Sequence, residues 1–304
     1  MARSLNQQVV VISGAGSGFG LSAARRFASC GAKVVVGSRN QTALQTIEEE
    51  VRSRGGAIAT AVTDVADREQ VERLASLAVE RFGRIDTWVN NAGVSLYATF
   101  EKITADEVHR IFQVNFMGQV HGMWAAVPRM RQNGGGVIIN VASVVGKRAM
   151  PLQNFYSASK FAVVGLSEAL RTELAIQKAN IKICVVCPPS VNTPFYDNAR
   201  TKEGYCPKPL PLVAEPDTLA RAIVSCARRP RRELWVTFTA KAFVGLSILF
   251  PSMMDLFIRT IGFGAELTRE PKSDNAPSNL FQPMPDVREE ADWTAWADRE
   301  GGRP

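Results

Sequence analysis

Short apolar runs rich in β-branched residues alternate with segments of helical periodicity along most of the chain. Runs such as VVVIS and VIINVA are apolar at nearly every position, which is typical of strands covered on both faces by helices. They recur at intervals of about 25 to 50 residues, the rhythm of strand–helix–strand units. We therefore predict an α/β fold, with a single doubly wound domain and a seven-stranded parallel sheet. The predicted strands are Val9–Ser13, Lys33–Gly37, Ala57–Val62, Asp86–Asn90, Gly136–Ala142, Ile181–Cys187 and Glu233–Phe238.

The segments between these strands carry helix signals. The stretch from Thr42 to Arg54 ends at two glycines, and the stretch from Asp67 to Phe82 ends at Gly83, so both have the stop that a helix needs. No repeat of solenoid length interrupts the alternation. We assign residues 1–239 to this one domain.

Beyond the last strand the pattern changes to a long apolar stretch. Ala242 to Met254 holds 13 residues without charge, and Pro251 interrupts it. A spanning helix needs about 20 apolar residues, so this stretch is too short and too broken. We expect residues 240–269 to be an apolar helical extension that acts as a lid or an oligomer surface. An interfacial helix that touches a membrane is the second interpretation.

The last segment, residues 270–304, is rich in Pro, Asp, Glu and Gly. It holds eight acidic and four basic residues and is predicted to be an acidic, irregular tail. Trp293 and Trp296 indicate that part of this tail docks on the body of the protein.

Cysteine and histidine usage argues against a disulfide framework and against a metal site. The five cysteines are scattered and odd in number, and the apolar run near the start is too short for a signal peptide, so we expect a cytoplasmic protein. Cys184 and Cys187 form a C-x-x-C, but on a strand they point to opposite faces. His109 and His121 are the only histidines. We predict no bound metal.

A glycine-rich segment joins the first strand to an amphipathic helix. Its spacing, G-x-x-x-G-x-G, leaves the backbone open to a pyrophosphate, and the N-terminus of the following helix adds a positive end. Taken alone, such a cluster also fits a merely tight turn. Its position between strand and helix favours a dinucleotide site. The predicted contact residues are Ser13, Gly14, Ser17, Gly18, Phe19 and Gly20.

The end of the second strand bears on the type of dinucleotide. NAD enzymes commonly place an acidic residue here for the ribose hydroxyls, whereas this chain has Ser38, Arg39 and Asn40. A guanidinium suits a 2′-phosphate, so we expect NADP(H) rather than NAD(H). The alternative is that Arg39 is a solvated loop residue.

Charge supports an anionic small ligand better than a nucleic acid. The net charge is +7, and the tail contributes −4, which leaves +11 for residues 1–269. No basic stripe interleaved with aromatic residues is present, so we predict no nucleic-acid partner.

Tyr156 and Lys160 stand four residues apart at the start of a helical segment. This spacing places both side chains on one face, about one turn apart. An ammonium beside the phenol is expected to lower the phenol pKa from about 10, so that it serves as acid or base near neutrality. In isolation the pattern also fits an ordinary surface pair.

In this order the motifs resemble those of the short-chain dehydrogenase/reductase family, over roughly Gln8 to Phe238. Ser13 stands where the family usually has threonine. The resemblance implies a Rossmann-type domain that transfers a hydride between a nicotinamide dinucleotide and an alcohol or carbonyl compound. The segments that carry it are Gly14, Gly18 and Gly20 of the cofactor loop, Asp64 and Val65 for the adenine, the NNAG at Asn90, Asn91, Ala92 and Gly93, then Asn115, Ser143, Tyr156 and Lys160.

The same resemblance implies a role for each reactive residue. Tyr156 exchanges a proton with the substrate oxygen, to which Ser143 donates a hydrogen bond. Lys160 holds the nicotinamide ribose and depresses the tyrosine pKa, and Asn115 positions a water. The simpler alternatives are a strand-end cap for Ser143, a helix-bending amide for Asn115 and a solvated charge for Lys160.

One departure from the family pattern lies after the sixth strand. Pro189 replaces the usual glycine, and proline cannot adopt a positive φ. By the resemblance, Pro188, Val191 and Thr193 still contact the nicotinamide half of the cofactor.

The substrate site is predicted from three segments: residues 195–214 as a lid, Val94 to Tyr97, and the apolar run after Ala242. Together they predict a pocket for a largely apolar alcohol or carbonyl compound. The leading hypothesis is an NADP(H)-dependent oxidoreductase that forms a homodimer or homotetramer. The alternatives are a membrane-surface dehydrogenase for lipid or steroid-type substrates, and a non-catalytic NADP(H)-sensing or scaffold protein.

Overall fold

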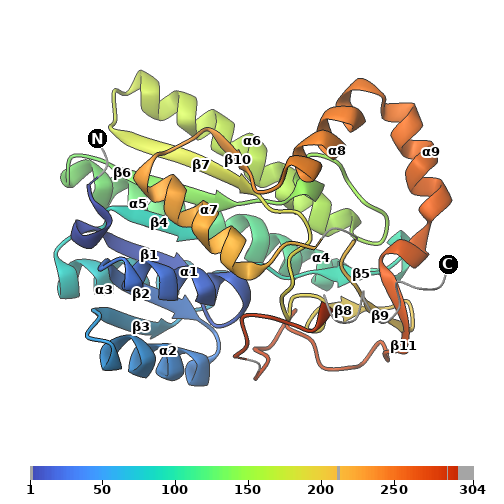
Figure 1. Cartoon of the computed structure of the whole chain (residues 1–304), viewed down its shortest axis with the longest axis horizontal. Helices are drawn as coiled ribbons and strands as arrows, with labels where there is room; N and C mark the ends of the chain where they lie inside the picture. Colours follow the sequence, from blue (N-terminus) through green and yellow to red (C-terminus); the bar gives the residue numbers. More distant parts are fainter. Residues whose placement is uncertain (1–2, 211–212, 286, 294–304) are drawn as a thin grey trace.

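The computed structural model describes residues 3–210, 213–285 and 287–293. Its centre is a seven-stranded sheet in the order β10-β7-β6-β4-β1-β2-β3, with every pair parallel (Figure 1). The prediction of a doubly wound α/β domain is confirmed. The strands are β1 (Val9–Ser13), β2 (Lys33–Ser38), β3 (Ile58–Val62), β4 (Thr87–Asn90), β6 (Gly136–Val141), β7 (Ile181–Cys187) and β10 (Glu233–Trp235).

The seventh strand is shorter than the predicted Glu233–Phe238, because a helix begins at Phe238. The side chain of Thr237 accepts a hydrogen bond from the backbone N–H of Ala240 and caps that helix.

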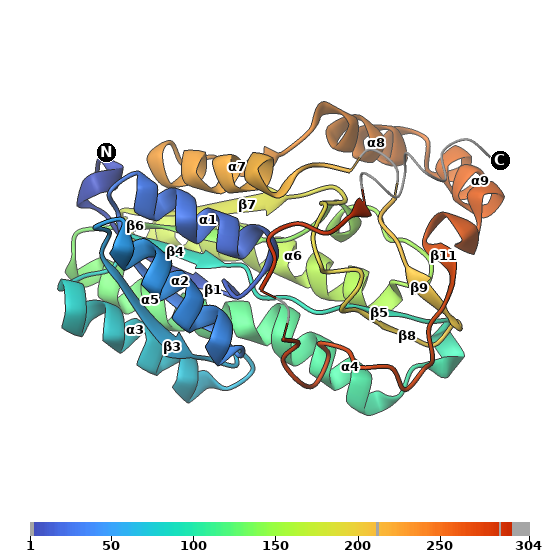
Figure 2. The ribbon, with the colours of Figure 1, turned by 60° about the horizontal axis from the view of Figure 1, so that its bottom comes forward.

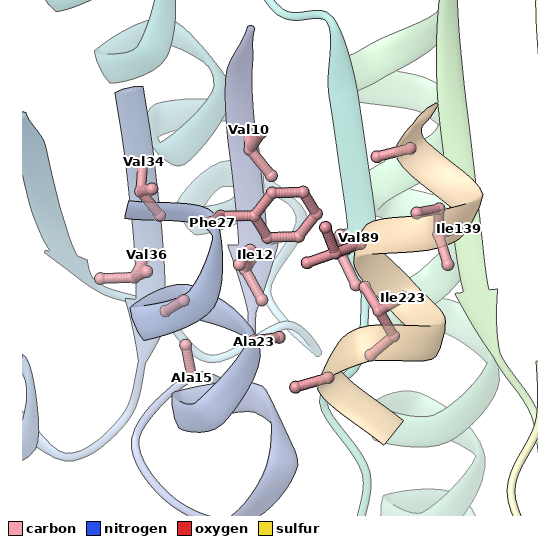
Figure 3. Packing of buried hydrophobic residues seen from close by; sticks show 14 of the residues in the cluster. Val10, Ile12, Ala15, Ala23, Phe27, Val34, Val36, Val89, Ile139 and Ile223 are labelled. Carbon is pink, nitrogen blue, oxygen red and sulfur yellow. The ribbon is translucent and has the colours of Figure 1, made fainter. Parts of the chain in front are cut away.

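Helices cover both faces of the sheet because alternate strand residues point to opposite sides. Val10 and Ile12 pack under the first layer of helices, and Figure 3 shows Phe27 beside them and Ile223 beside Val89. Val9 and Val11 face the other side. The first layer contains α1 (Gly18–Ser29), α2 (Gln41–Ser53) and α7 (Pro216–Arg228), and the second contains α3 (Arg68–Phe82), α4 (Ala105–Phe112), α5 (Gly118–Gln132) and α6 (Asn154–Ile176).

Cys184 and Cys187 are both buried in β7 on opposite faces of the sheet. Cys184 belongs to the cluster under α1 and α7, whereas Cys187 packs against Val163 and Val164 of α6. Within the described residues no group of three or more His, Cys, Asp or Glu side chains could hold a metal ion.

The strand order reverses between β1 and β4. From β1 the chain moves outward to β2 and β3, then returns to the other side of β1. In open α/β sheets, ligands bind at the carboxyl ends of the strands beside such a reversal. The glycine turn after β1 and the NNAG segment after β4 therefore meet at this edge.

The remaining elements of the domain are short. A π-helical turn, η3, carries Asn115 between α4 and α5. This turn spans Gln113–Met117. The other short elements are β5 (Leu96–Tyr97) paired with β8 (Arg200–Thr201), β9 (Tyr205–Pro207), and the short helices η1 (Leu5–Gln7), η2 (Phe100–Lys102), η4 (Val144–Gly146) and η5 (Phe263–Ala265).

The C-terminal extension contains α8 (Phe238–Leu249) and α9 (Pro251–Ile261), which meet at a bend of 119°. No single described helix is long and apolar enough to cross a membrane, although these two together meet the length and composition. The strand β11 (Leu267–Pro271) then pairs with β9 and so crosses the boundary that the sequence placed after residue 269.

After β11 the tail runs back past α4 toward the start of α1 (Figure 2). Trp293 is buried against Tyr196, with ring centres 6.0 Å apart. Trp296, the other tryptophan expected to dock, lies outside the described residues.

Candidate active site

The turn after β1 requires glycine at several positions. Gly14 and Gly18 have φ values of 71° and 56°, in the left-handed region. A Cβ on Gly14 would lie 2.5 Å from the Cα of Ala92, and one on Gly20 would lie 2.4 Å from the carbonyl oxygen of Gly14. Only a chain without these side chains brings the turn this close to the segment after β4.

Asn91 holds the two segments together. Its side-chain amide donates to the carbonyl oxygens of Ser13 and Gly14 at 3.2 and 2.8 Å, and its backbone N–H donates to the hydroxyl of Ser13. Ser13 is buried and braces this junction, so it supports the cleft without lining it.

A cleft runs along this edge and is lined by most of the residues predicted to hold a dinucleotide. Asp64 lies in it and forms an ion pair with Arg110 at 2.6 Å. The predicted residues that line the cleft are Gly14, Ser17, Gly18, Phe19, Gly20, Ser38, Arg39, Asp64, Val65, Asn91, Ala92, Gly93 and Thr193.

The C-terminal tail lies across the same cleft, which the sequence did not predict. Arg39 donates to the carbonyl oxygens of Asn279 and Phe281 at 2.5 and 3.3 Å, and the N–H of Gly18 donates to the carbonyl oxygen of Arg288 at 2.9 Å. Arg39 is therefore not a solvated loop residue. A phosphate bound at either donor competes with these tail carbonyls.

Two anchors hold the tail in place. Leu280 is fully buried in the core under α3, α4 and α5, and Glu289 forms an ion pair with Arg25 of α1 at 2.5 Å. The sequence analysis named Trp293 and Trp296 as docking residues and did not predict either anchor.

Tyr156 and Lys160 lie on one face of α6, as their spacing predicts, and both are buried. The ammonium lies 5.6 Å from the centre of the phenol ring and donates to the carbonyl oxygen of Val141 at 3.0 Å. Burial lowers the pKa of Lys160 to about 8.

The expected lowering of the Tyr156 pKa is absent from this arrangement. Burial, with a contribution from Tyr196, raises the pKa of Tyr156 above its ordinary value, and only the hydrogen bond with Ser143 acts toward a lower pKa. The prediction was wrong for this state because the ammonium of Lys160 bonds to a backbone carbonyl rather than to the phenol oxygen.

Ser143 stands at the end of β6, where its hydroxyl accepts a hydrogen bond from the N–H of Val145 and caps η4. The same side chain hydrogen-bonds to Tyr156. The capping role and contact with the phenol thus coexist.

Asn115 is fully buried on the π-helical turn. Its side-chain oxygen accepts from the N–H of Val94 at 2.8 Å, and its amide donates to the Val94 carbonyl and to the Ser159 hydroxyl at 2.9 and 3.1 Å. It therefore braces the segment after β4 against α6, one residue from Lys160.

A second cavity, of about 400 Å³, opens beside the phenol and is mainly apolar. Five residues, Phe19, Asn91, Gly93, Thr193 and Phe195, line both this cavity and the dinucleotide cleft. The two spaces adjoin, so a single ligand bound on the glycine turn can extend to Tyr156 and Lys160. Ser143, Pro188, Pro189 and Val191 also line this second cavity.

The walls come largely from the segments predicted to enclose substrate. Phe195, Tyr196 and Leu210 line the cavity from the predicted lid, and α8 and α9 supply Phe243 and Ile258 among others. The segment from Val94 to Tyr97 contributes less than expected. Val94 lines the dinucleotide cleft, whereas Tyr97 is fully buried behind the wall.

A buried carboxylate behind the cavity was not predicted. Glu266 accepts a hydrogen bond of 2.6 Å from Gln153, which lines the cavity just before α6. Burial raises the pKa of Glu266 to about 7. Because this residue lies in the extension after η5, nothing in the linear pattern connected it to Tyr156.

Comparisons with known proteins agree with this geometry. The family model described as short chain dehydrogenase matches residues 8–204. The oxidoreductase YxnA of Bacillus subtilis is 35% identical over 281 residues, 92% of this chain and 79% of that protein. A 3-ketodihydrosphingosine reductase of Bacteroides thetaiotaomicron is 36% identical over 199 residues, 66% of this chain and 70% of that protein.

Two solved structures are similar across most of the chain. A short-chain dehydrogenase/reductase from Burkholderia phymatum in complex with NAD has a TM-score of 0.75 and 28% identity, covering 83% of this chain and 96% of that one. An alcohol dehydrogenase from Thermococcus sibiricus complexed with 5-hydroxy-NADP has a TM-score of 0.65 and 27% identity, covering 75% of this chain and 95% of that one. With this fold, these motifs and these relatives, the chain belongs to the short-chain dehydrogenase/reductase family of oxidoreductases.

Proposed function

We propose that this protein is an NADP(H)-dependent oxidoreductase that interconverts an apolar alcohol and its ketone or aldehyde. The observation that carries the proposal is the adjoining of two spaces, a glycine-lined cleft and an apolar cavity that contains Ser143, Tyr156 and Lys160. In the direction of reduction, a dinucleotide in the cleft would bring a hydride donor to the substrate carbon, and the phenol in the cavity would be the proton donor to its oxygen.

The geometry of the glycine turn supports the binding of a dinucleotide in the cleft. Gly14 and Gly20 let the turn pack closely against Ala92 and Asn91, and the backbone N–H of Gly18, at the start of α1, donates to a carbonyl oxygen of the tail rather than within the helix. Arg39 would bind a 2′-phosphate, Asp64 and Val65 would contact the adenine, and Lys160 would bond the nicotinamide ribose. When bound, NADP(H) supplies or accepts the hydride.

Reduction of a carbonyl develops negative charge on the substrate oxygen, which needs donors and a proton. Tyr156 donates that proton as the carbon receives the hydride, and Ser143 donates a hydrogen bond to the same oxygen. The ammonium of Lys160 stabilises the tyrosinate that remains, provided that it exchanges the Val141 carbonyl for the ribose and the phenol. Asn115 positions a water that returns a proton to this pair. Oxidation follows the same steps in reverse.

The preference for NADP(H) rests on Arg39 and on the lack of an acid after β2. The related structures contain NAD in one case and a hydroxy-NADP in the other, so the family accommodates both. We propose the phosphorylated dinucleotide because a guanidinium at this position attracts the 2′-phosphate that an acid would repel. We also propose a homodimer or homotetramer.

Consumption of NADPH over a panel of apolar ketones, aldehydes and quinones tests the proposal. Tyr156→Phe should reduce turnover by at least a thousandfold, since it removes the proton donor, while NADPH binding measured by fluorescence stays within about twofold of the wild type. A fully active Phe variant would refute the assignment. Tight NADPH binding with no turnover on any carbonyl compound would favour the non-catalytic sensor.

A further inference from the structure

The outer face of α8 and α9 is covered by large apolar side chains. Of the 17 large hydrophobic residues that are exposed in the described part of the chain, nine lie between Phe238 and Phe263. Ile248 and Leu249 are both 71% exposed and Leu256 is 58% exposed. Elsewhere exposed apolar residues are scattered singly, as on most proteins. This face is therefore a continuous apolar surface of the kind that marks an interaction site.

The bend between the two helices concentrates these side chains at one end of the molecule. The chain turns by 119° at Phe250 and Pro251, and Figure 1 shows α8 and α9 standing away from the sheet. The inner face of the two helices packs against the domain: Val244 of α8 contacts the cluster of Val144, and Ile258 of α9 contacts the cluster of Tyr156. Within residues 3–210, 213–285 and 287–293, the outer face and the tip of the bend stay exposed.

The charges around this surface suit an anionic partner. Lys241 and Arg259 are exposed at its edges. Asp255 is the only acidic residue in α8 and α9, and it forms an ion pair with Arg148. Exposed apolar side chains on helices with two exposed basic residues, and with their one carboxylate paired with Arg148, match the boundary between lipid headgroups and acyl chains.

The apolar surface is continuous with the substrate cavity. Phe257 lines the cavity and is also 49% exposed, so it lies at the mouth. Phe243 and Ile261, which line the same cavity, are half-buried. A molecule that enters between these residues would contact apolar side chains on its way to the phenol.

We propose that α8 and α9 dock into the interface of an anionic phospholipid bilayer and that the cavity takes a long-chain ketone or alcohol directly from that bilayer. The docking proposal depends only on the exposed apolar surface and its charges. The proposed substrate class depends in addition on the proposed oxidoreductase function. A second copy of this chain is the competing occupant of the same surface.

Co-sedimentation of the full-length protein with vesicles tests the docking without any activity measurement. Vesicles of phosphatidylcholine with phosphatidylglycerol are compared with vesicles of phosphatidylcholine alone. The wild type should bind the anionic vesicles more strongly. The double variant Leu249→Glu with Leu256→Glu should bind at least tenfold more weakly. Ile176→Glu, which changes a 76% exposed residue on α6, is the matched control and should bind like the wild type.

Two results overturn the docking proposal. One is wild-type binding that is absent or equal to that of the double variant. The other is a wild-type dimer that the double variant converts to a monomer with no vesicle binding by either protein, which assigns the surface to a second copy. NADPH binding measured on each variant shows that it is folded, because the changed residues lie outside the cleft and the cavity lining.

The substrate class is tested by how the ketone is presented. With a water-soluble ketone such as cyclohexanone, the double variant should match the wild type. With a long-chain aliphatic ketone embedded in anionic vesicles, it should be at least tenfold slower. Equal rates on the vesicle-borne ketone overturn delivery from the bilayer. If neither ketone is reduced by the wild type, the proposed oxidoreductase function fails, and the vesicle-binding result is unaffected.

Discussion

Replacing Lys160 with methionine should make the protein more stable at neutral pH while abolishing its proposed activity. Lys160 is 2% exposed, and burial lowers the pKa of its ammonium from 10.5 to about 8. At about 1.4 kcal/mol for each tenfold change, that difference in pKa corresponds to a cost of about 3 kcal/mol for folding with the lysine charged. Methionine has a similar length and carries no charge, so it removes this cost.

The sign follows from proton binding. Below pH 8 the folded and unfolded chains both hold the proton, and the full cost is present. Between pH 8 and about 10.5 the folded chain releases it first, so wild-type stability rises, and above 10.5 the cost is gone. The stability advantage of Lys160→Met should therefore shrink by about 3 kcal/mol across this range. Methionine also leaves the Val141 carbonyl without its donor, but that offset does not change with pH.

Guanidinium unfolding of both proteins at pH 7, 8.5 and 10.5 measures this change. Lys182→Met, which alters an exposed lysine of β7, is the control and should show a difference that does not vary with pH. A stability difference for Lys160→Met that stays constant across the range would mean that the ammonium is well solvated in the folded protein, and the reasoning from burial would fail.

Three further predictions concern the cofactor cleft and its surroundings. Arg39→Ala should raise the KM for NADPH at least tenfold and change that for NADH by less than twofold, since it removes the partner of a 2′-phosphate; equal losses in steady-state assays would contradict the preference. Glu289→Ala breaks the ion pair that holds the tail over Gly18 and should lower the Kd for NADPH, measured by titration, by roughly two- to fivefold. The control Glu49→Ala, at an exposed residue, should leave this Kd unchanged. Weaker NADPH binding by the Glu289 variant would instead show that the tail assists binding of the cofactor. Burial raises the pKa of Glu266 from 4.5 to about 7, so the free energy of unfolding of the wild type falls by about 3 kcal/mol as pH rises from 4.5 to 7. Urea unfolding over this pH range should show that Glu266→Gln lacks this fall. If the free energies of wild type and variant change equally with pH, the argument from burial is wrong.

The sheet was predictable because its signal is local. Each of the seven strands is a short apolar run, and the structure shortens only the last of them by several residues, where Phe238 already belongs to α8. The glycine turn and the pairing of Tyr156 with Lys160 were predictable for the same reason, since helix geometry alone fixes a spacing of four. Their burial also follows from the position of α6 against the sheet.

The electrostatics of the site were not predictable from spacing. A spacing of four places the ammonium near the phenol ring, but it does not specify which acceptor the ammonium chooses. In the folded chain the ammonium of Lys160 donates to the carbonyl of Val141, and burial has the largest effect on the pKa of both Tyr156 and Lys160. The same holds for Glu266, whose contact with Gln153 joins residues far apart in the sequence.

The C-terminal tail covers two donors of the cofactor motif, and the motif alone gave no sign of this cover. Arg39 and the N–H of Gly18 are the donors that the sequence assigned to phosphates, and in the structure both donate to neutral carbonyl oxygens of the tail. Hydrogen bonds to a charged phosphate are roughly twice as strong as those to neutral acceptors. We therefore expect a phosphate to replace the tail carbonyls at these two donors, and in its absence the tail supplies their acceptors. The residues proposed to bind the cofactor and the tail residues that cover them thus come from different parts of the chain, the first recognised from a local motif and the second only from the folded protein.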